Sequence, residues 1–174
     1  MLENKVTSVV QRDTVYGTVG GKVLFTLIFT KAELMLAFLC ENRTAACIQD
    51  KLRSLWYGLG EDMFSRLFPV LLTDNSGEFI NPTAIEKRED GLLRTYIFYC
   101  DPGASYQKGA VERNHEFIRL ILPQGFSFDE LTQTQIDRMM LHIDSYSRAI
   151  LYAKSPCEMF AFLFGDDASN DCCV

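Results

Sequence analysis

Residues 69–79 constrain the fold of this chain more than any other stretch. They run Pro-Val-Leu-Leu-Thr-Asp-Asn-Ser-Gly-Glu-Phe, so a proline begins an apolar run and turn residues end it. Such a run is typical of a fully buried strand, and Asp74 stands at its carboxyl end. Open α/β sheets carry their functional residues at that end of their strands. We therefore expect Asp74 either to belong to a functional site or to cap the turn with its side chain.

The composition predicts one globular domain with a substantial core. The chain has 174 residues, of which 48% are hydrophobic and 23% charged, ordinary values for such a domain. No apolar run reaches the roughly 18 residues that a membrane span needs, and no leader precedes the first strand-like segment. We therefore expect a cytoplasmic protein with no membrane partner. The formal net charge of −6 is unfavourable for binding a polyanion.

The six cysteines and two histidines do not form a metal-binding pattern. No Cys-x-x-Cys pair occurs, so we expect neither a zinc finger nor a disulfide framework. Cys40 and Cys100 lie in apolar, strand-like runs and are expected in the core. Cys172 and Cys173 stand in the polar segment 166–174, which we expect to fray.

Hydrophobic periodicity predicts a mixed sheet of five strands. Strand-like segments at 6–19, 22–30 and 34–40 come first, and Gly20-Gly21 joins the first two as a hairpin. For the third segment, periodicity also allows a short buried helix. Two helical segments then precede the strand that ends at Asp74, as a crossover onto a parallel neighbour requires. The predicted helices lie at 44–57, 62–68, 81–87, from 109, at 132–150 and at 157–164, with the fifth strand at 94–100.

This element order matches the ribonuclease-H-like plan, a mixed α/β sheet with helices on both faces. Such a sheet can place Asp13, on the first strand, beside Asp74 on an adjacent strand. Glu112 stands at the start of the helix after the fifth strand and can then project toward both acids. The spacing between the three acids leaves room for the intervening elements.

Three carboxylates that converge in one cleft repel one another, and their pKa values rise unless cations neutralise them. Hard divalent ions suit such a site, with Mg²⁺ as the physiological ion and Mn²⁺ as its substitute. Two ions about 4 Å apart can stabilise both the attacking and the leaving oxygen of an in-line phosphoryl transfer. We therefore expect Asp13, Asp74 and Glu112 to be both the catalytic residues and the metal ligands.

Three segments resemble the acid-bearing motifs of DDE transposases with an integrase core, most closely those of the insertion-sequence "IS-thirty" family. They are Asp-Thr-Val-Tyr-Gly at 13–17, Leu-Thr-Asp-Asn-Ser-Gly-Glu-Phe at 72–79 and Tyr-Gln-Lys-Gly-Ala-Val-Glu-Arg-Asn at 106–114. Two downstream segments, around 123–132 and at 154–160, also resemble blocks of that family. The resemblance covers residues 11–165.

The resemblance implies DNA cleavage at the end of a mobile element, followed by attack of the freed 3′-hydroxyl on target DNA. It implies that Asp13 bridges two metal ions while Asp74 and Glu112 each hold one. It also implies that four residues of the third motif and the helix after it lie near the scissile phosphate or the DNA backbone: Lys108, Arg113, His115 and Arg119. For these four residues, a solvated helix face is an equal expectation.

Two other interpretations stay open at this point. A metal-dependent nuclease of the same fold needs the same acids but cleaves without joining, and an inactive remnant acts only as an interaction module. We assign residues 1–165 to the catalytic core and 166–174 to a polar tail. The residues before Asp13 leave no room for the N-terminal helix-turn-helix region of the family, so we interpret the chain as the core of a longer transposase. Because transposition requires synapsis, we expect a homodimer or a higher assembly.

Overall fold

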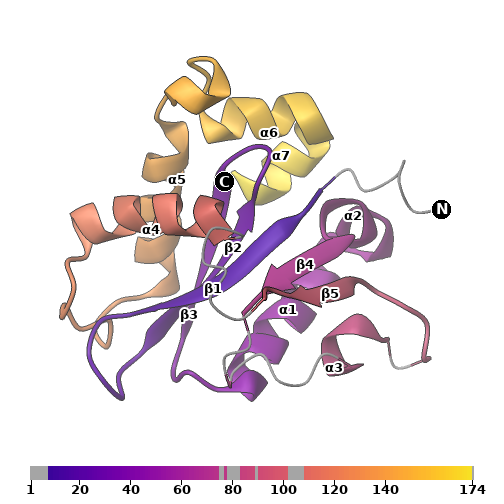
Figure 1. The fold of residues 1–174 in the computed structure, drawn as a ribbon, viewed down its shortest axis with the longest axis horizontal. Helices are drawn as coiled ribbons and strands as arrows, with labels where there is room; N and C mark the ends of the chain where they lie inside the picture. Colours follow the sequence, from indigo (N-terminus) through magenta and orange to yellow (C-terminus); the bar gives the residue numbers. More distant parts are fainter. Residues whose placement is uncertain (1–7, 75–76, 78–82, 89, 102–107, 174) are drawn as a thin grey trace.

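A five-stranded sheet with helices on both faces forms the centre of the molecule (Figure 1). The computed structural model describes residues 8–74, 77, 83–88, 90–101 and 108–173. The strands follow one another in space as β3-β2-β1-β4-β5, antiparallel among the first three and parallel from β1 to β4 to β5. They are β1 (Val10–Tyr16), β2 (Val23–Phe29), β3 (Leu34–Cys40), β4 (Val70–Thr73) and β5 (Tyr96–Tyr99). The predicted mixed sheet is confirmed, and the third segment is a strand rather than a helix.

Most helices begin where the sequence predicts. They are α1 (Ala45–Leu59), α2 (Glu61–Leu67), α3 (Thr83–Glu86), α4 (Gly109–Ile121), α5 (Gln133–Ser145), the 3₁₀ turn η3 (Ala149–Leu151), α6 (Pro156–Phe164) and α7 (Asp166–Cys172). Thr132 and Ser155 form capping boxes that start α5 and α6, because each satisfies free N–H groups of the first turn. Among the described residues, no helix is both long enough and apolar enough to cross a membrane.

Each face of the sheet carries its own hydrophobic core, because successive side chains of a strand point to opposite faces. One core packs against α1, α2, α6 and α7 and is rich in phenylalanine; the rings of Phe29 and Phe160 meet edge to face at 4.8 Å. The other core packs against α4 and α5. Cys40 and Cys100 are buried as predicted. The residues of β1 that face the second core therefore lie beneath α4.

The C-terminal third departs from prediction in two places. Helix α5 ends at Ser145 rather than near residue 150, because the chain turns back on itself and pairs Arg148 with Lys154. Tyr152 and Ala153 adopt positive φ values of 55° and 64° in this turn. The polar segment after residue 165, expected to fray, forms α7 instead, and Ala168 of that helix is fully buried against the first core.

Candidate active site

Two of the three predicted acids meet at adjacent parallel strands. Asp13 lies on β1, and Asp74 directly follows the last residue of β4. The strand register pairs Gln11 with Leu72, so Asp13 and Asp74, each two residues further on, reach the same level of the sheet. Both carboxylates contact the ammonium group of Lys108, whose Nζ lies 2.8 Å from Oδ2 of Asp13 and 3.4 Å from Oδ2 of Asp74. The two acids thus converge on one cation.

Lys108 is the N-cap residue of α4, and its side chain is only 9% exposed. The second carboxylate oxygen of Asp13 accepts a hydrogen bond from the backbone N–H of Thr14 at 2.8 Å. An ammonium group that is removed from water requires such paired charges.

Cys100 lies near this cluster of charges. Burial raises the pKa of its thiol, which favours the protonated form and leaves this cysteine a poor nucleophile.

Glu112 is not brought into contact with the other two acids. It lies in the first turn of α4 with an exposed side chain, one helical turn after Lys108 and therefore on the same side of the helix. Within the described ranges, no three His, Cys, Asp or Glu side chains lie close enough together to hold a metal ion. The predicted convergence of all three acids is therefore observed for Asp13 and Asp74 alone.

His115 faces the sheet rather than the solvent. Its Nε2 lies 2.8 Å from the hydroxyl of Thr26, and that hydroxyl donates to the carbonyl oxygen of Asp13 at 3.2 Å. Because the hydroxyl hydrogen is used in this bond, Nε2 of His115 is the donor to Thr26. Burial lowers the pKa of His115 to about 4, with Lys108 acting in the same direction and Asp13 opposing it. His115 is therefore neutral at pH 7 and braces the strand that carries Asp13.

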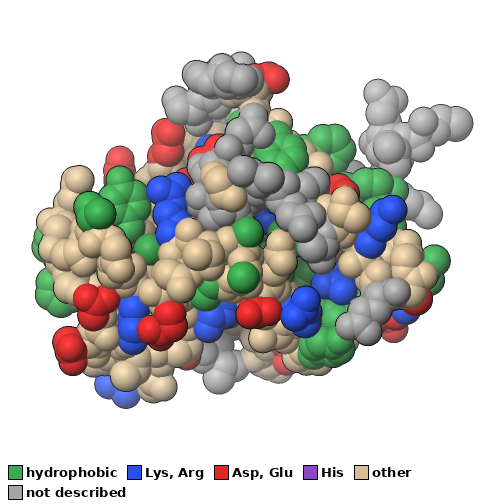
Figure 2. All heavy atoms as spheres, turned by 90° about the horizontal axis from the view of Figure 1, so that it is seen from below, with side chains coloured by type: hydrophobic (Ala, Val, Ile, Leu, Met, Phe, Trp, Pro, Cys, Tyr) green, Lys and Arg blue, Asp and Glu red, His purple; other side chains and the backbone are tan. Residues whose placement is uncertain are grey.

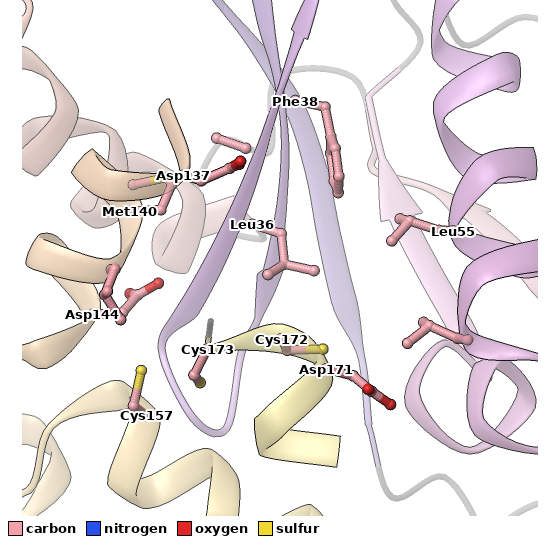
Figure 3. Close-up of a pocket in the computed structure, with 13 residues that line it drawn as sticks. Leu36, Phe38, Leu55, Asp137, Met140, Asp144, Cys157, Asp171, Cys172 and Cys173 are labelled. Atoms are coloured by element: carbon pink, nitrogen blue, oxygen red, sulfur yellow. The ribbon is translucent and has the colours of Figure 1, made fainter. Parts of the chain in front are cut away.

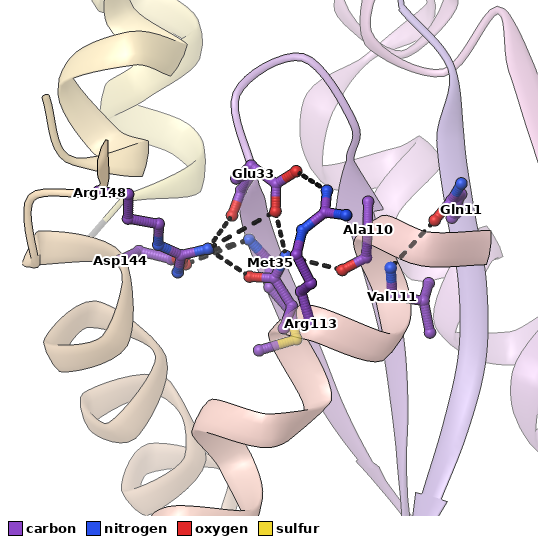
Figure 4. A network of polar contacts seen from close by, with 9 residues as sticks. Gln11, Glu33, Met35, Ala110, Val111, Arg113, Asp144 and Arg148 are labelled. Carbon is purple, nitrogen blue, oxygen red and sulfur yellow. Dashed lines mark hydrogen bonds and ion pairs between the residues drawn. The ribbon is translucent and has the colours of Figure 1, made fainter. Parts of the chain in front are cut away.

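A buried polar network fixes the middle of α4 to the turn between β2 and β3 (Figure 4). Glu33, buried in that turn, accepts hydrogen bonds from Arg113 at 2.6 Å and from Asn114 at 2.8 Å. Arg148 donates to the side-chain oxygen of Asn114 at 2.7 Å and to the carbonyl oxygen of Glu33 at 3.2 Å. These hydrogen bonds offset much of the free-energy cost of burying the network. They do not satisfy every donor, because Nε and Nη2 of Arg148 are buried without a hydrogen bond, and Nη2 lies 3.6 Å from the carboxylate of Asp144.

The four residues predicted to approach DNA all have partners within the protein. Lys108 contacts Asp13 and Asp74, Arg113 contacts Glu33, His115 contacts Thr26, and Arg119 donates to the carbonyl oxygen of Tyr16 at 2.8 Å. The side chain of Arg113 is nevertheless 50% exposed, so its outer surface is accessible to a ligand. These contacts fasten α4 across β1 and the β2–β3 turn.

The sequence interpretation missed four residues that shape this site: Gln11, Thr26, Glu33 and Asn114. Gln11 could have been found, because it stands two residues before Asp13 and therefore on the same face of the strand. Thr26 could also have been found, since the hairpin register places it opposite Asp13. No local signal identifies Glu33, a buried acid at a positive φ of 54°.

Two surface features lie outside this site. A pocket of about 250 Å³ opens between β3 and the helices α1, α5, α6 and α7 (Figure 3), and neither Asp13 nor Asp74 lines it. On the face shown in Figure 2, Lys and Arg side chains are interspersed with Asp and Glu side chains, in keeping with the acidic balance of the sequence. The visible part of this face is therefore not a uniformly basic surface.

Known proteins with similar sequences carry integrase and transposase names. The chain is 26% identical over 161 residues to a protein of Spiroplasma virus SpV1-R8A2 B that is named as integrase ORF3, a match that covers 91% of this chain and 48% of that protein. It is 29% identical over 94 residues to the transposase for insertion sequence element IS4351 of Bacteroides fragilis, covering 54% of this chain and 28% of the transposase. The chain thus spans about half the length of these relatives or less. No protein-family model matches it.

Among solved structures, the catalytic core domain of BIV integrase is similar to this chain. The TM-score is 0.62 at 18% sequence identity, and the match covers 88% of this chain and 93% of that domain. The observed sheet, with three antiparallel strands followed by two parallel ones and helices on both faces, agrees with this match. The chain therefore has the ribonuclease-H-like fold of an integrase catalytic core.

Proposed function

We propose that this chain is the catalytic core of a DDE-type transposase or integrase, which cleaves and joins DNA strands by metal-dependent phosphoryl transfer. The observation that carries this proposal is the convergence of Asp13 and Asp74 on one cation at adjacent parallel strands. The similarity to proteins named integrase and transposase supports it. The closer assignment to the "IS-thirty" family is part of the proposal and depends on the three sequence motifs alone. We assign the catalytic core to residues 1–165.

The residues present suit a divalent ion. Carboxylate oxygens are the ligands that Mg²⁺ prefers, and two of them already surround one positively charged group. We propose Asp13 as the ligand shared by two Mg²⁺ ions, with Asp74 and Glu112 each completing one site; Mn²⁺ would substitute. Glu112 must turn toward the pair from its exposed position on α4. When bound, such ions would activate the attacking oxygen and stabilise the leaving one.

The other residues of the site have supporting roles in this proposal. Gln11, Thr26 and His115 fix α4 against β1 and β2, so they set where the first turn of α4, which carries Glu112, lies relative to Asp13. Arg113 and Arg119 would approach the DNA backbone with the parts of their side chains that face solvent.

A homodimer or higher assembly would bring two DNA ends together, and analytical ultracentrifugation with and without DNA tests that assembly.

A joining assay separates this function from its alternatives. The purified chain is incubated with supercoiled plasmid and an end-labelled duplex oligonucleotide in Mg²⁺ or Mn²⁺. We expect nicked plasmid and label joined to plasmid, and a loss of at least about 100-fold in both products for Asp13→Asn and Asp74→Asn, since each change removes a charged ligand. Glu112→Gln is expected to behave likewise.

The matched control is Glu116→Gln, which changes the same residue type one turn further along α4 at another exposed position. It should leave both products unchanged. Nicking without joining would favour the nuclease alternative. Cleavage that is absent, or that is unaffected by the Asp13 and Asp74 substitutions in folded protein, would contradict the proposal and favour an interaction module.

A further inference from the structure

Lys108 places a positive charge at the point where the carboxylates of Asp13 and Asp74 converge. Its Nζ lies 2.8 Å from one and 3.4 Å from the other. The lysine side chain is 9% exposed, whereas those of Asp13 and Asp74 are 24% and 40% exposed. The ammonium group is therefore the inner member of the cluster, and the two acids remain accessible from solvent.

This placement has an electrostatic reason. Two carboxylates close enough to share one cation repel each other, and a cation between them removes that repulsion. The same position, surrounded by carboxylate oxygens, is the one that a hard divalent ion would take. An ammonium group and a divalent ion cannot both occupy it, because their charges repel and their contacts with the oxygens coincide.

We propose that Lys108 is a built-in counterion that holds Asp13 and Asp74 together in the metal-free protein and that a divalent ion displaces on binding. This inference rests on the proposed function and adds to it a competition within the site. The displaced ammonium group remains at the N-terminal end of α4, beside the acids, where it can contact a phosphate of bound DNA. Lys108 thus serves as the counterion of Asp13 and Asp74 in the metal-free protein and contacts DNA once the metal is bound.

Competition between Lys108 and a divalent ion for the same position predicts in which direction the metal affinity changes when the ammonium group is removed. The apparent affinity for metal is reduced by the fraction of molecules in which Lys108 occupies the position. Removing the ammonium group therefore tightens metal binding, while it destabilises the metal-free protein because two carboxylates lose their shared partner. A lysine that served only the fold would show the destabilisation without the tighter binding.

Isothermal titration with Mn²⁺ tests this inference on the wild type, Lys108→Met and Lys108→Arg. The methionine keeps the aliphatic stem and removes the charge, whereas the arginine keeps the charge. We expect Lys108→Met to bind Mn²⁺ about tenfold or more tightly than the wild type, and Lys108→Arg to bind no more tightly. Lys31→Met, at an exposed position in the β2–β3 turn, is the control and should bind as the wild type does.

A second measurement uses the wild type alone and does not depend on the variants folding. Acetylation of Lys108 by an amine-reactive reagent, followed by mass spectrometry, should increase several-fold when Mn²⁺ is added, because the ammonium group leaves its buried position. Lys31 should be acetylated equally with and without Mn²⁺.

The outcomes separate the inference from the function on which it rests. Wild-type binding of Mn²⁺, with equal or weaker binding by Lys108→Met and unchanged acetylation, overturns the inference and leaves the proposed metal site intact. An absence of Mn²⁺ binding by the wild type and by Lys108→Met overturns both. Loss of Mn²⁺ binding in Asp13→Asn, together with tighter binding in Lys108→Met, supports both.

Discussion

The side-chain oxygen of Gln11 accepts a hydrogen bond from the backbone N–H of Val111 at 3.0 Å. This bond joins strand β1 to the first turn of α4, where backbone N–H groups have no partner within the helix. The N-cap residue of α4, Lys108, makes no side-chain capping bond, so Gln11 supplies one from the sheet. Because Gln11 and Asp13 project from the same face of β1, the bond sets where α4 lies relative to Asp13.

Replacing Gln11 should therefore weaken the fold at the site. Gln11→Met keeps the size of the side chain but leaves the buried Val111 N–H unsatisfied, and we expect a loss of about 1–3 kcal/mol in the free energy of unfolding. Urea denaturation measures it. Gln124→Met, at an exposed position in the loop after α4, should change stability by less than about 0.5 kcal/mol. Equal effects of the two substitutions would contradict the capping role of Gln11.

Acid should destabilise the protein through His115. Burial lowers its pKa from 6.5 to about 4, so between these values the unfolded chain binds a proton that the folded protein does not. The free energy of unfolding must then fall as the pH drops from 6.5 toward 4, by roughly 2–3 kcal/mol for this residue. Urea denaturation at steps between pH 7.5 and 4.5 measures the slope.

Two histidine variants separate this contribution from other acid effects. His115→Gln removes the titrating ring and should flatten the slope between pH 6.5 and 4.5. His142→Gln replaces an exposed histidine that lies against Tyr146 and should keep the wild-type slope. A wild-type slope that persists in His115→Gln would show that other groups cause the acid sensitivity.

Glu33 is the central acceptor of the network in Figure 4, and its loss should be costly. Glu33→Gln removes the buried charge that pairs with Arg113 and accepts from Asn114, and it leaves Asp144 as the remaining acidic partner of Arg148. We expect a loss of about 3 kcal/mol or more in the free energy of unfolding. Glu41→Gln is the matched control, because Glu41 pairs with Lys22 at 3.5 Å with a side chain that is 76% exposed. Its loss should stay below about 1 kcal/mol. Chemical denaturation of both variants decides between these expectations.

Two glycines should respond to alanine with opposite signs. A methyl group at Gly17 would lie 1.7 Å from the carbonyl oxygen of Phe126, whereas one at Gly58 meets nothing within 4 Å. Gly17→Ala must displace the backbone after α4 and should cost roughly 1–3 kcal/mol or more. Gly58 lies within α1, so Gly58→Ala should stabilise by about 0.5–1 kcal/mol. Thermal unfolding of both variants measures the two shifts, and a stabilising Gly17→Ala would contradict the close approach.

Local sequence patterns were sufficient to predict the strands and the position of Asp74 at the end of one of them. Apolar runs and turn residues are recognisable within a few consecutive residues, so they do not depend on contacts between distant parts of the chain. They predicted that Asp13 and Asp74 would meet, since parallel neighbours bring the acids to one level of the sheet. They did not predict that Lys108 lies between them, because its partners come from residues 34 and 95 positions away. They also did not predict the turn after α5 that pairs Arg148 with Lys154, because Tyr152 and Ala153 take positive φ values there without the glycine that usually signals such a turn.

The central claim is that Asp13 and Asp74 form a divalent cation site, and anomalous diffraction from crystals grown with Mn²⁺ tests it most directly. We predict an anomalous peak about 2 Å from carboxylate oxygens of both residues, with Lys108 turned out of the position between them. Data collected at saturating Mn²⁺ that show no peak at these carboxylates, and Lys108 still bound to both, would contradict the claim.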